Sequence, residues 1–260
     1  ARVPVGETCE FCVMLASRGF VYLTRETANL GGGFHNGRCD CNVVPSWGER
    51  HIAGYDPDAL YRQYKSCADT ISSLTTQDKY KDYLSTLSDK EKAKAPEYKK
   101  WKRDLELAEM RWRDRTWLNT GTPPPITFPN DELKRETETA RPQEIRTANR
   151  LRKHGVTPAF QIDYTIVKNP QTGVEERRGL ADWAGGIEIK TPDRAGKRTT
   201  IEHYLANASK KQDCTRLIID NTENACMSDE QLIEIIKTIN RFKRGSVYIL
   251  DHSENLIRIK

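Results

Sequence analysis

The chain contains 260 residues with a formal net charge of +5, and 30% of its residues are charged. This length exceeds the commonest single-domain size and leaves room for two modules, each with its own core. The modest charge does not indicate a strongly basic nucleic-acid binder, and no apolar run in the sequence is long enough to predict a membrane-spanning helix.

The first feature along the chain is a group of four cysteines and one histidine within residues 9–41. Cys9 and Cys12 form one close pair, and Cys39 and Cys41 form a second pair, with His35 just before it. Thiolate and imidazole groups bind Zn²⁺ tetrahedrally, and a short, loop-rich segment gains stability from the ion. The pattern predicts a structural zinc site made by four of these five residues, with the four thiolates preferred and His35 as the substitute. Two disulfides or four buried free thiols are the alternatives.

Two helical stretches follow the cysteine cluster. Residues 55–74 are predicted to be helical because apolar side chains recur on one stripe: Leu60, Tyr64, Cys67 and Ile71. Residues 79–117 are rich in Lys, Glu, Arg, Trp and Tyr, which is typical of solvated helices packed against a small core. Breaks in this second stretch are expected near residues 87–90 and at Pro96.

A proline-rich segment separates the two halves of the chain. Residues 120–125 read Thr-Gly-Thr-Pro-Pro-Pro, a stiff, extended stretch that neither a helix nor a strand crosses. We therefore expect one domain over residues 1–120, a linker over 121–129 and a second domain over 130–260.

The second half alternates between helix and strand patterns. The predicted elements are a helix over 142–151 with Gly155 as its stop, strands over 160–167, 174–182 and 186–190, a helix over 201–211, a strand over 217–220, a helix opened by the capping box Ser228-Asp-Glu-Gln231 and closed near Gly245, and strands over 247–250 and 256–259. The order α-β-β-β-α-β-α-β-β predicts a compact α/β domain. The whole chain is thus expected to be a multidomain protein, with an α-rich, zinc-stabilised first domain and this α/β second domain.

The most informative segment of the second half is Asp182-Trp-Ala-Gly-Gly-Ile-Glu-Ile-Lys190. In a strand, Glu188 and Lys190 point to one face, and Ile187 and Ile189 point to the other. The Gly-Gly pair allows a turn that brings Asp182, on a neighbouring strand, beside them. Two carboxylates hold a hard divalent cation such as Mg²⁺, and a lysine stabilises phosphate charge, which indicates metal-assisted phosphodiester hydrolysis. A Glu-x-Lys pair alone is a weak signal, because solvated strand faces often carry one.

Basic residues gather on the helices that flank this segment. Arg150 and Lys153 lie on the helix before it, and Lys210 and Lys211 lie at the end of the helix after it. If these side chains surround Glu188, they form a groove that binds the phosphates of a substrate. The alternative is that they are ordinary solvated helix faces.

Several motifs of residues 130–260 occur together in one known group of domains. They are the helix Glu144-x3-Ala148-x2-Leu151-x3-Gly155, Asp182, Glu188-Ile-Lys190 and Lys210-Lys-Gln212. In these features the segment resembles the toxin nuclease domains of bacterial contact-dependent inhibition and other polymorphic toxin systems. Those domains use a PD-(D/E)xK-type core, and several of them cleave transfer RNA. The resemblance implies that Glu144, Asp182 and Glu188 surround the metal or scissile phosphate, that Lys190 stabilises charge, and that Gln212 orients a phosphate or water. The Pro of the motif name is absent before Asp182.

The first half carries a second resemblance. Its residues are Cys9-x2-Cys12-x-Met-Leu-Ala-Ser-Arg-Gly19, then His35 and Cys39-x-Cys41-x2-Val-Pro45, and finally the stretch 108–123. In these features, residues 1–125 resemble the minor head proteins of tailed phages, the MuF-like group. The resemblance implies that the Cys-His cluster is the metal knot of a capsid-associated protein. The spacing between His35 and Cys39 departs slightly from that pattern.

Together these features predict a phage-encoded polymorphic toxin, in which a head-protein segment is fused to a metal-dependent ribonuclease for transfer RNA. The resemblance implies structural Zn²⁺, catalytic Mg²⁺ or a similar ion, a cognate immunity protein, a translation factor as a further partner, and association with the phage capsid. The expected location is the phage virion or the bacterial cytoplasm, without membrane insertion. One alternative is a non-enzymatic head protein whose α/β domain binds another protein and whose Asp182, Glu188 and Lys190 form a weak surface cluster. The other alternative is a DNase on the same core.

Overall fold

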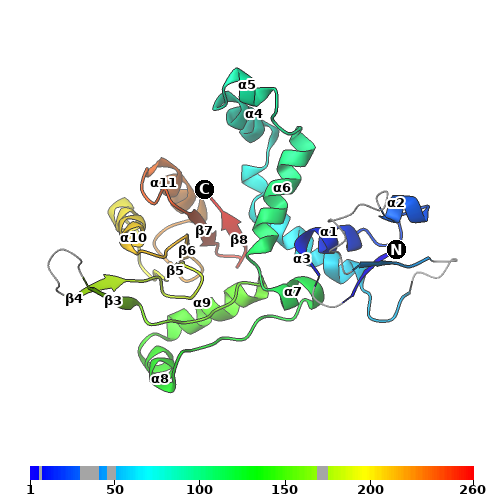
Figure 1. Cartoon of the computed structure of the whole chain (residues 1–260). Coiled ribbons are helices and arrows are strands. Elements are labelled where there is room, and N and C mark those ends of the chain that lie inside the picture. The colour runs from blue at the N-terminus through cyan, green and yellow to red at the C-terminus, as the bar shows by residue number, and fades with distance from the viewer. Residues whose placement is uncertain (6–7, 30–40, 46–50, 169–174) are drawn as a thin grey trace. The chain divides into compact units, whose positions relative to one another are not determined.

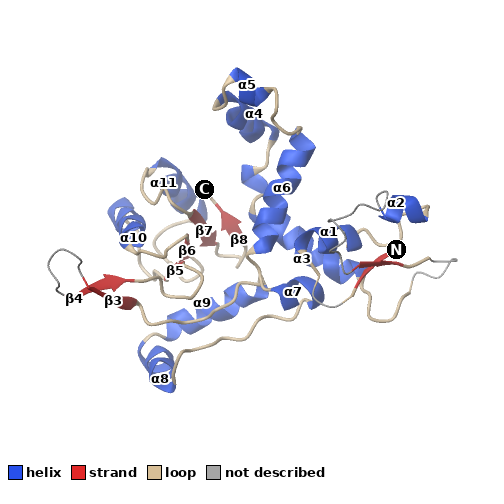
Figure 2. Ribbon diagram, viewed as in Figure 1, coloured by secondary structure: helices blue, strands red, loops and turns tan. Residues whose placement is uncertain are grey.

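The computed structural model describes all residues except 6–7, 30–40, 46–50 and 169–174. The described residues form two compact units. The first unit comprises residues 1–124 together with 154–156, and the second comprises residues 125–153 and 157–260. Both units contain helices and small sheets (Figure 1, Figure 2), so the chain has mixed α and β structure.

The first unit is mainly helical. Its two short strands, β1 (Arg2–Pro4) and β2 (Cys41–Val43), pair antiparallel. Its described helices are α1 (Glu10–Ala16), α2 (Arg25–Asn29), α3 (Pro57–Thr70), a 3₁₀ turn (Ser72–Leu74), α4 (Gln77–Ser85), α5 (Asp89–Lys92), α6 (Tyr98–Arg111) and α7 (Arg115–Thr120). Apolar side chains of α1, α3, α6 and α7 form one core, which includes Val13, Leu60, Met110 and Leu118.

The helix predicted over residues 55–74 is present as α3, with a later start and an earlier end at Thr70, and the 3₁₀ turn Ser72–Leu74 follows it. It begins at Pro57, because the Asp56 carboxylate accepts a hydrogen bond from the Ala59 backbone N–H at 2.9 Å and so caps the helix. Along the predicted stripe, three of the four apolar residues are buried: Leu60, Cys67 and Ile71. The breaks expected in the following stretch are also present, since α4, α5 and α6 are separated near residues 86–88 and 93–97.

The second unit begins with two helices, α8 (Asp131–Ala140) and α9 (Pro142–Lys153). Its strands and remaining helices are β3 (Tyr164–Lys168), β4 (Glu175–Gly179), β5 (Ile187–Lys190), α10 (Arg198–Lys210), β6 (Arg216–Asp220), α11 (Asp229–Thr238), β7 (Ser246–Leu250) and β8 (Leu256–Arg258). From α9 onward, this is the predicted order α-β-β-β-α-β-α-β-β.

Some predicted boundaries were wrong. The first strand begins at Tyr164 rather than at residue 160, and Phe160 contributes only an isolated bridge to Trp183. The second strand ends at Gly179 instead of at Asp182. Helix α11 ends well before Gly245, because the residue after Thr238 already has an extended backbone.

The main sheet of the second unit has the strand order β5-β6-β7-β8. Strands β5, β6 and β7 are parallel, and β8 is antiparallel to β7, whereas β3 and β4 form a separate antiparallel hairpin. Alternate residues of β6 and β7, such as Leu217 and Val247, share a buried core with Leu205 of α10 and Ile236 of α11. By the two-residue period of a strand, Asp220 belongs to the opposite face, and there it contacts α9.

Among the described residues, no helix is both long and apolar enough to cross a membrane.

A buried carboxylate and lysine cluster at the edge of the parallel sheet

A tight turn precedes β5 and places Asp182 beside this strand. The Trp183 backbone N–H donates to the Ile187 carbonyl at 2.9 Å, and the chain reverses through Gly185 and Gly186 with φ values of +82° and +75°. At Gly186 a Cβ would lie 2.2 Å from the carbonyl oxygen of Asp213, so that only glycine fits there. The predicted Gly-Gly turn is therefore present, although Asp182 lies in a bend and not on a strand.

Asp182 is held to β5 by a backbone contact. Strand β5 is the edge of its sheet, and one of its outward N–H groups, that of Ile189, donates to Asp182 Oδ2 at 2.9 Å. The carboxylate thus satisfies a backbone donor that a neighbouring strand would otherwise satisfy. Because of this bond, the Asp182 side chain lies next to the Glu188 and Lys190 side chains.

Four charged side chains meet at this point, and we call Asp182, Glu188, Lys190 and Lys211 the carboxylate–lysine cluster. Lys190 Nζ lies 2.6 Å from Glu188 Oε1 and 3.8 Å from Asp182 Oδ2. Lys211 Nζ lies 2.6 Å from Glu188 Oε2 and 3.0 Å from Asp182 Oδ1. Each lysine therefore contacts both carboxylates, and the formal charges of the four groups cancel.

Burial makes these contacts stronger than those of a surface pair. The Glu188 side chain is 0% exposed, Lys211 is 19% exposed and Asp182 is 25% exposed. Burial, with the nearby Asp182 charge, raises the pKa of Glu188 although both lysines act to lower it. Burial acts to lower the pKa of Lys211, but the Asp182 and Glu188 charges outweigh it and raise that pKa. The interpretation of these residues as an exposed surface cluster is thus wrong for Glu188.

The ammonium of Lys190 lies among oxygen atoms of three different groups. Besides the two carboxylates, its Nζ contacts the Ile189 carbonyl oxygen at 3.0 Å. Two carboxylates and one backbone carbonyl are a hard-oxygen ligand set that suits Mg²⁺. Among the described residues, no three His, Cys, Asp or Glu side chains are grouped for metal binding. A cation here would consequently take part of its coordination from the backbone, which sequence patterns do not reveal.

Glu144 lies near this cluster from the first turn of α9. Its side chain is one-fifth exposed, and it forms an ion pair with Arg141 at 3.5 Å. Burial raises the pKa of Glu144; the Arg141 charge opposes this shift and the Asp182 charge adds to it. Glu144 and Asp182 both line a cavity of about 380 Å³, together with Arg141, Gln161 and Asp163. This cavity offers a route from solvent to the cluster.

The residues at the end of α10 do not lie as the resemblance implied. The helix ends at Lys210, and Lys211 has an extended backbone that directs its side chain into the cluster. Gln212 is exposed, and its described contact is a backbone hydrogen bond to the Gly179 carbonyl at 3.3 Å. The position that Gln212 was expected to fill is thus occupied by Lys211, and Lys210 is exposed on the last helical turn.

The basic residues of α9 contact carboxylates of the same unit. Arg150 contacts Asp220 at 3.1 Å, Glu223 at 2.6 Å and Glu254 at 3.3 Å, and Lys153 contacts Glu254 at 2.9 Å. Both side chains were expected to face substrate phosphates near Glu188. In the folded chain they are neutralised by ion pairs at the ends of β6 and β7 instead.

The zinc prediction falls partly outside the described residues, which do not include His35 or Cys39. Of the other three candidate ligands, Cys9 precedes α1, Cys12 is buried within α1, and Cys41 opens β2. The Cys41 Sγ lies 3.6 Å from the Thr8 hydroxyl. The zinc site therefore stays a prediction.

Comparisons with known proteins give two findings. The family model described as VG15 protein, a viral and phage family, matches residues 1–67, the part that contains the cysteine cluster. Among solved structures, the "CdiA-CT/CdiI toxin and immunity complex from Burkholderia pseudomallei" is similar, with 17% sequence identity over 54% of this chain and 96% of that chain. Its TM-score of 0.32 is too low to establish a shared fold. No curated protein matches the chain.

Proposed function

We propose that the second unit is a divalent-cation-dependent endonuclease that cleaves RNA, with transfer RNA as its substrate. The observation that carries this proposal is the set of oxygen atoms around Lys190 Nζ. Oxygens of Asp182, Glu188 and Ile189 lie within 3.8 Å of this one positive charge. A second lysine, Lys211, completes the cluster. These groups suit metal-assisted phosphodiester hydrolysis, because carboxylate and carbonyl oxygens bind a cation and ammonium groups stabilise phosphate charge.

The two carboxylates and the Ile189 carbonyl would hold a Mg²⁺-type ion. When bound, such an ion supplies Lewis acidity and lowers the pKa of a coordinated water. The Glu188 side chain is fully buried, whereas the Lys190 side chain is 24% exposed. Lys190 would therefore be the partner that moves, turning its ammonium toward the scissile phosphate. Lys211 stays within reach of both carboxylates and fixes their orientation. Glu144, which lines the cavity beside Asp182 and has a raised pKa, would accept a proton from the attacking water.

The finer parts of the proposal rest on sequence resemblance. The likeness of residues 130–260 to contact-dependent-inhibition nucleases suggests transfer RNA as substrate, an immunity protein as partner and a translation factor as a helper. The likeness of residues 1–125 to phage head proteins, with the VG15 match over residues 1–67, suggests that a phage carries this toxin. Structural Zn²⁺ in the first unit belongs to the same proposal.

The test uses the full chain with total bacterial RNA, with Mg²⁺ added or without any added divalent cation. The wild-type protein should cut the transfer RNA band only with Mg²⁺, and Glu188→Gln should abolish cleavage. Glu230→Gln is the matched control, because Glu230 is exposed on α11 and forms no ion pair among the described residues. Circular dichroism of each variant shows whether the fold is retained.

Each outcome of this test distinguishes the competing functions. Undiminished cleavage by Glu188→Gln would remove the proposed centre. Cleavage of duplex DNA but not of RNA would favour the DNase on the same core. If neither nucleic acid is cut, even after a bacterial extract is added to supply a helper factor, the second unit is a binding module and the nuclease proposal fails.

A further inference from the structure

A second polar cavity lies on another side of α9, within the same unit. Its volume is about 310 Å³, and it is bordered by α9, by the residues that follow β5 and by those that follow β6. Thr191 lines it and directly follows Lys190 of the cluster. The carboxyl ends of adjacent parallel strands, where this cavity opens, are the usual place for ligand binding in α/β sheets.

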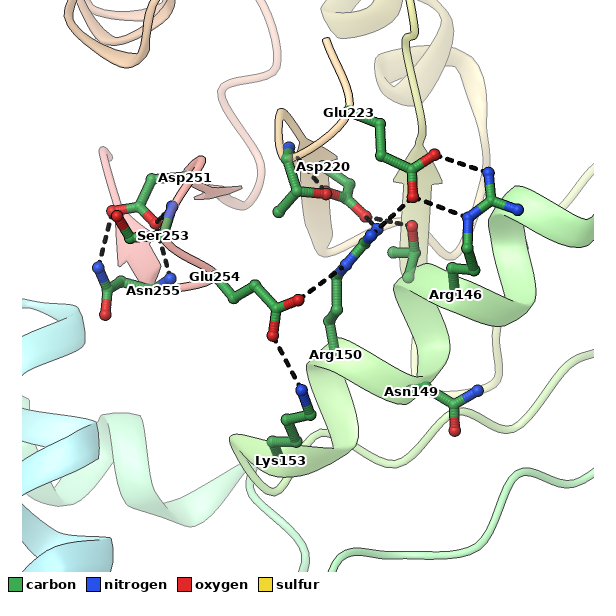
Figure 3. A network of polar contacts seen from close by, with 12 residues as sticks. Arg146, Asn149, Arg150, Lys153, Asp220, Glu223, Asp251, Ser253, Glu254 and Asn255 are labelled. Atoms are coloured by element: carbon green, nitrogen blue, oxygen red, sulfur yellow. Dashed lines mark hydrogen bonds and ion pairs between the residues drawn. The ribbon is translucent and has the colours of Figure 1, made fainter.

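Two arginines of α9 converge on one carboxylate at the edge of this cavity (Figure 3). Arg146 forms a two-pronged contact with Glu223, with its Nε 2.7 Å from Oε1 and its Nη2 2.6 Å from Oε2. Arg150 Nη2 contacts Oε1 of the same carboxylate at 2.6 Å. The Glu223 side chain is 37% exposed and Arg146 is 50% exposed, so this contact is open to solvent.

The neighbouring acidic groups have other partners. Asp220, which is almost fully buried, accepts hydrogen bonds from the hydroxyl groups of Thr147 and Thr222 in addition to its contact with Arg150. Glu254 contacts Lys153 and the Nε of Arg150. Within the described chain, Glu223 is therefore the only carboxylate that contacts the Arg146 guanidinium.

We propose that Arg146 and Arg150 form a second phosphate site for the polynucleotide, which Glu223 occupies while the protein is free. The proposal rests on the nuclease function proposed above. A phosphodiester group and a carboxylate each carry one negative charge and two oxygens that a guanidinium contacts in parallel, so either can fill the same site. The Arg146–Glu223 side of this contact is open to solvent, so a phosphate that offers the same charge and the same two oxygens can exchange with the Glu223 carboxylate.

The position of the arginines would let them bind a second phosphate of the same RNA strand. Thr191, one residue beyond Lys190 of the cluster, lines this cavity, so a strand whose scissile phosphate lies at the cluster can place another phosphate between the arginines. Arg150 is held by Asp220 and Glu254 as well, whereas Glu223 is the one carboxylate on Arg146 among the described residues, so displacing Glu223 would leave the Arg146 guanidinium for the phosphate. Glu223 thus acts as a built-in competitor that lowers the affinity for RNA.

The test measures binding of a fluorescein-labelled single-stranded RNA to the full chain by anisotropy, with Mg²⁺ omitted so that no cleavage occurs. Glu223→Gln should bind about fivefold more tightly, the factor that corresponds to ~1 kcal/mol. Glu230→Gln removes the same charge from α11 and should leave the affinity unchanged. The double variant Arg146→Gln/Glu223→Gln should lose the gain, and its binding should show a shallower salt dependence.

Three results would overturn the proposal. The first is equal affinity of Glu223→Gln and Glu230→Gln, and the second is a gain that survives the added Arg146→Gln change. The third is displacement of the RNA by inorganic phosphate when RNA and inorganic phosphate supply equal concentrations of phosphate groups. This result would make the cavity a site for free phosphate. Because binding is read without cleavage, a protein that binds as expected and cuts nothing contradicts only the nuclease function. A protein that cuts RNA while Glu223→Gln has no effect contradicts only the second phosphate site.

Discussion

Removing Lys211 tests whether the carboxylate–lysine cluster is an energetically coupled unit. In Lys211→Met the apolar stem is kept, but Glu188 loses an ammonium at 2.6 Å and Asp182 loses one at 3.0 Å. Removing one partner of a fully buried ion pair costs about 3–5 kcal/mol. Here Lys190 still neutralises Glu188 at 2.6 Å and Asp182 is partly hydrated, so we expect a loss of about 2 kcal/mol.

The loss should depend on pH with a defined sign. Lys211 acts to lower the pKa of Glu188, which burial has raised, so the variant raises that pKa further. A carboxyl group whose pKa is raised in the folded state contributes stability below its unfolded pKa, and this contribution disappears as pH rises through the folded pKa. The deficit of Lys211→Met should therefore be larger at neutral pH than at mildly acidic pH. Adding Glu188→Gln, which removes the unpaired charge, should restore part of the stability at neutral pH.

The assay is urea denaturation of the full chain, with hydrogen exchange of the β6 amides to assign the transition to the second unit. Lys210→Met is the control, since Lys210 is the exposed neighbour on the last turn of α10. A Lys211→Met variant as stable as Lys210→Met, or one with the same deficit at both pH values, would show that Lys211 and the two carboxylates are not energetically coupled.

Two further predictions concern the turn before β5 and the turn after β7. Gly186→Ala should destabilise the second unit by about 2 kcal/mol or more, because its Cβ would overlap the Asp213 carbonyl. Gly185→Ala has open space around it and should cost only about 1 kcal/mol. Equal losses of stability in thermal unfolding would contradict this prediction. The hydrogen bond to Asp229 at 2.9 Å raises the pKa of His252, so this pair stabilises the fold fully below about pH 6.5, the unfolded value, and the stabilisation is lost as pH rises through the folded pKa. Stability measured across this range should fall with pH in the wild type and stay flatter in His252→Gln, and identical profiles would count against the pair.

The sequence predicted those parts of the structure that depend on local patterns. The capping box at Ser228 opens α11, with the Gln231 side chain bonded back to the cap, because both partners lie within one turn. The strand period correctly placed Glu188 and Lys190 on one face, and the two glycines correctly indicated a turn. Each of these signals is contained in a few neighbouring residues.

The errors arose in two situations. In one, a helix end shifted by one residue changes which side chain enters the site; in the other, the contact partner lies far away along the chain. Sequence patterns fix a helix end only to within one or two residues, and here that margin separates Lys211, which enters the cluster, from Gln212, which faces solvent. The partners of Arg150 could not be read either, since Asp220 and Glu254 lie 70 and 104 residues away along the chain.

Because of these long separations, the contacts of α9 can form only after a delay during synthesis of the chain. Arg150 reaches its contact on Glu254 only after 104 further residues have been made, which takes roughly 5 to 20 seconds at the usual rate of synthesis. Asp220 and Glu223 are made 70 and 73 residues after Arg150, so α9 gains its anchors at the end of β6 first and its anchor at Glu254 later. The anchoring of α9, the helix that carries Glu144, is therefore completed late, after the ribosome has passed Glu254.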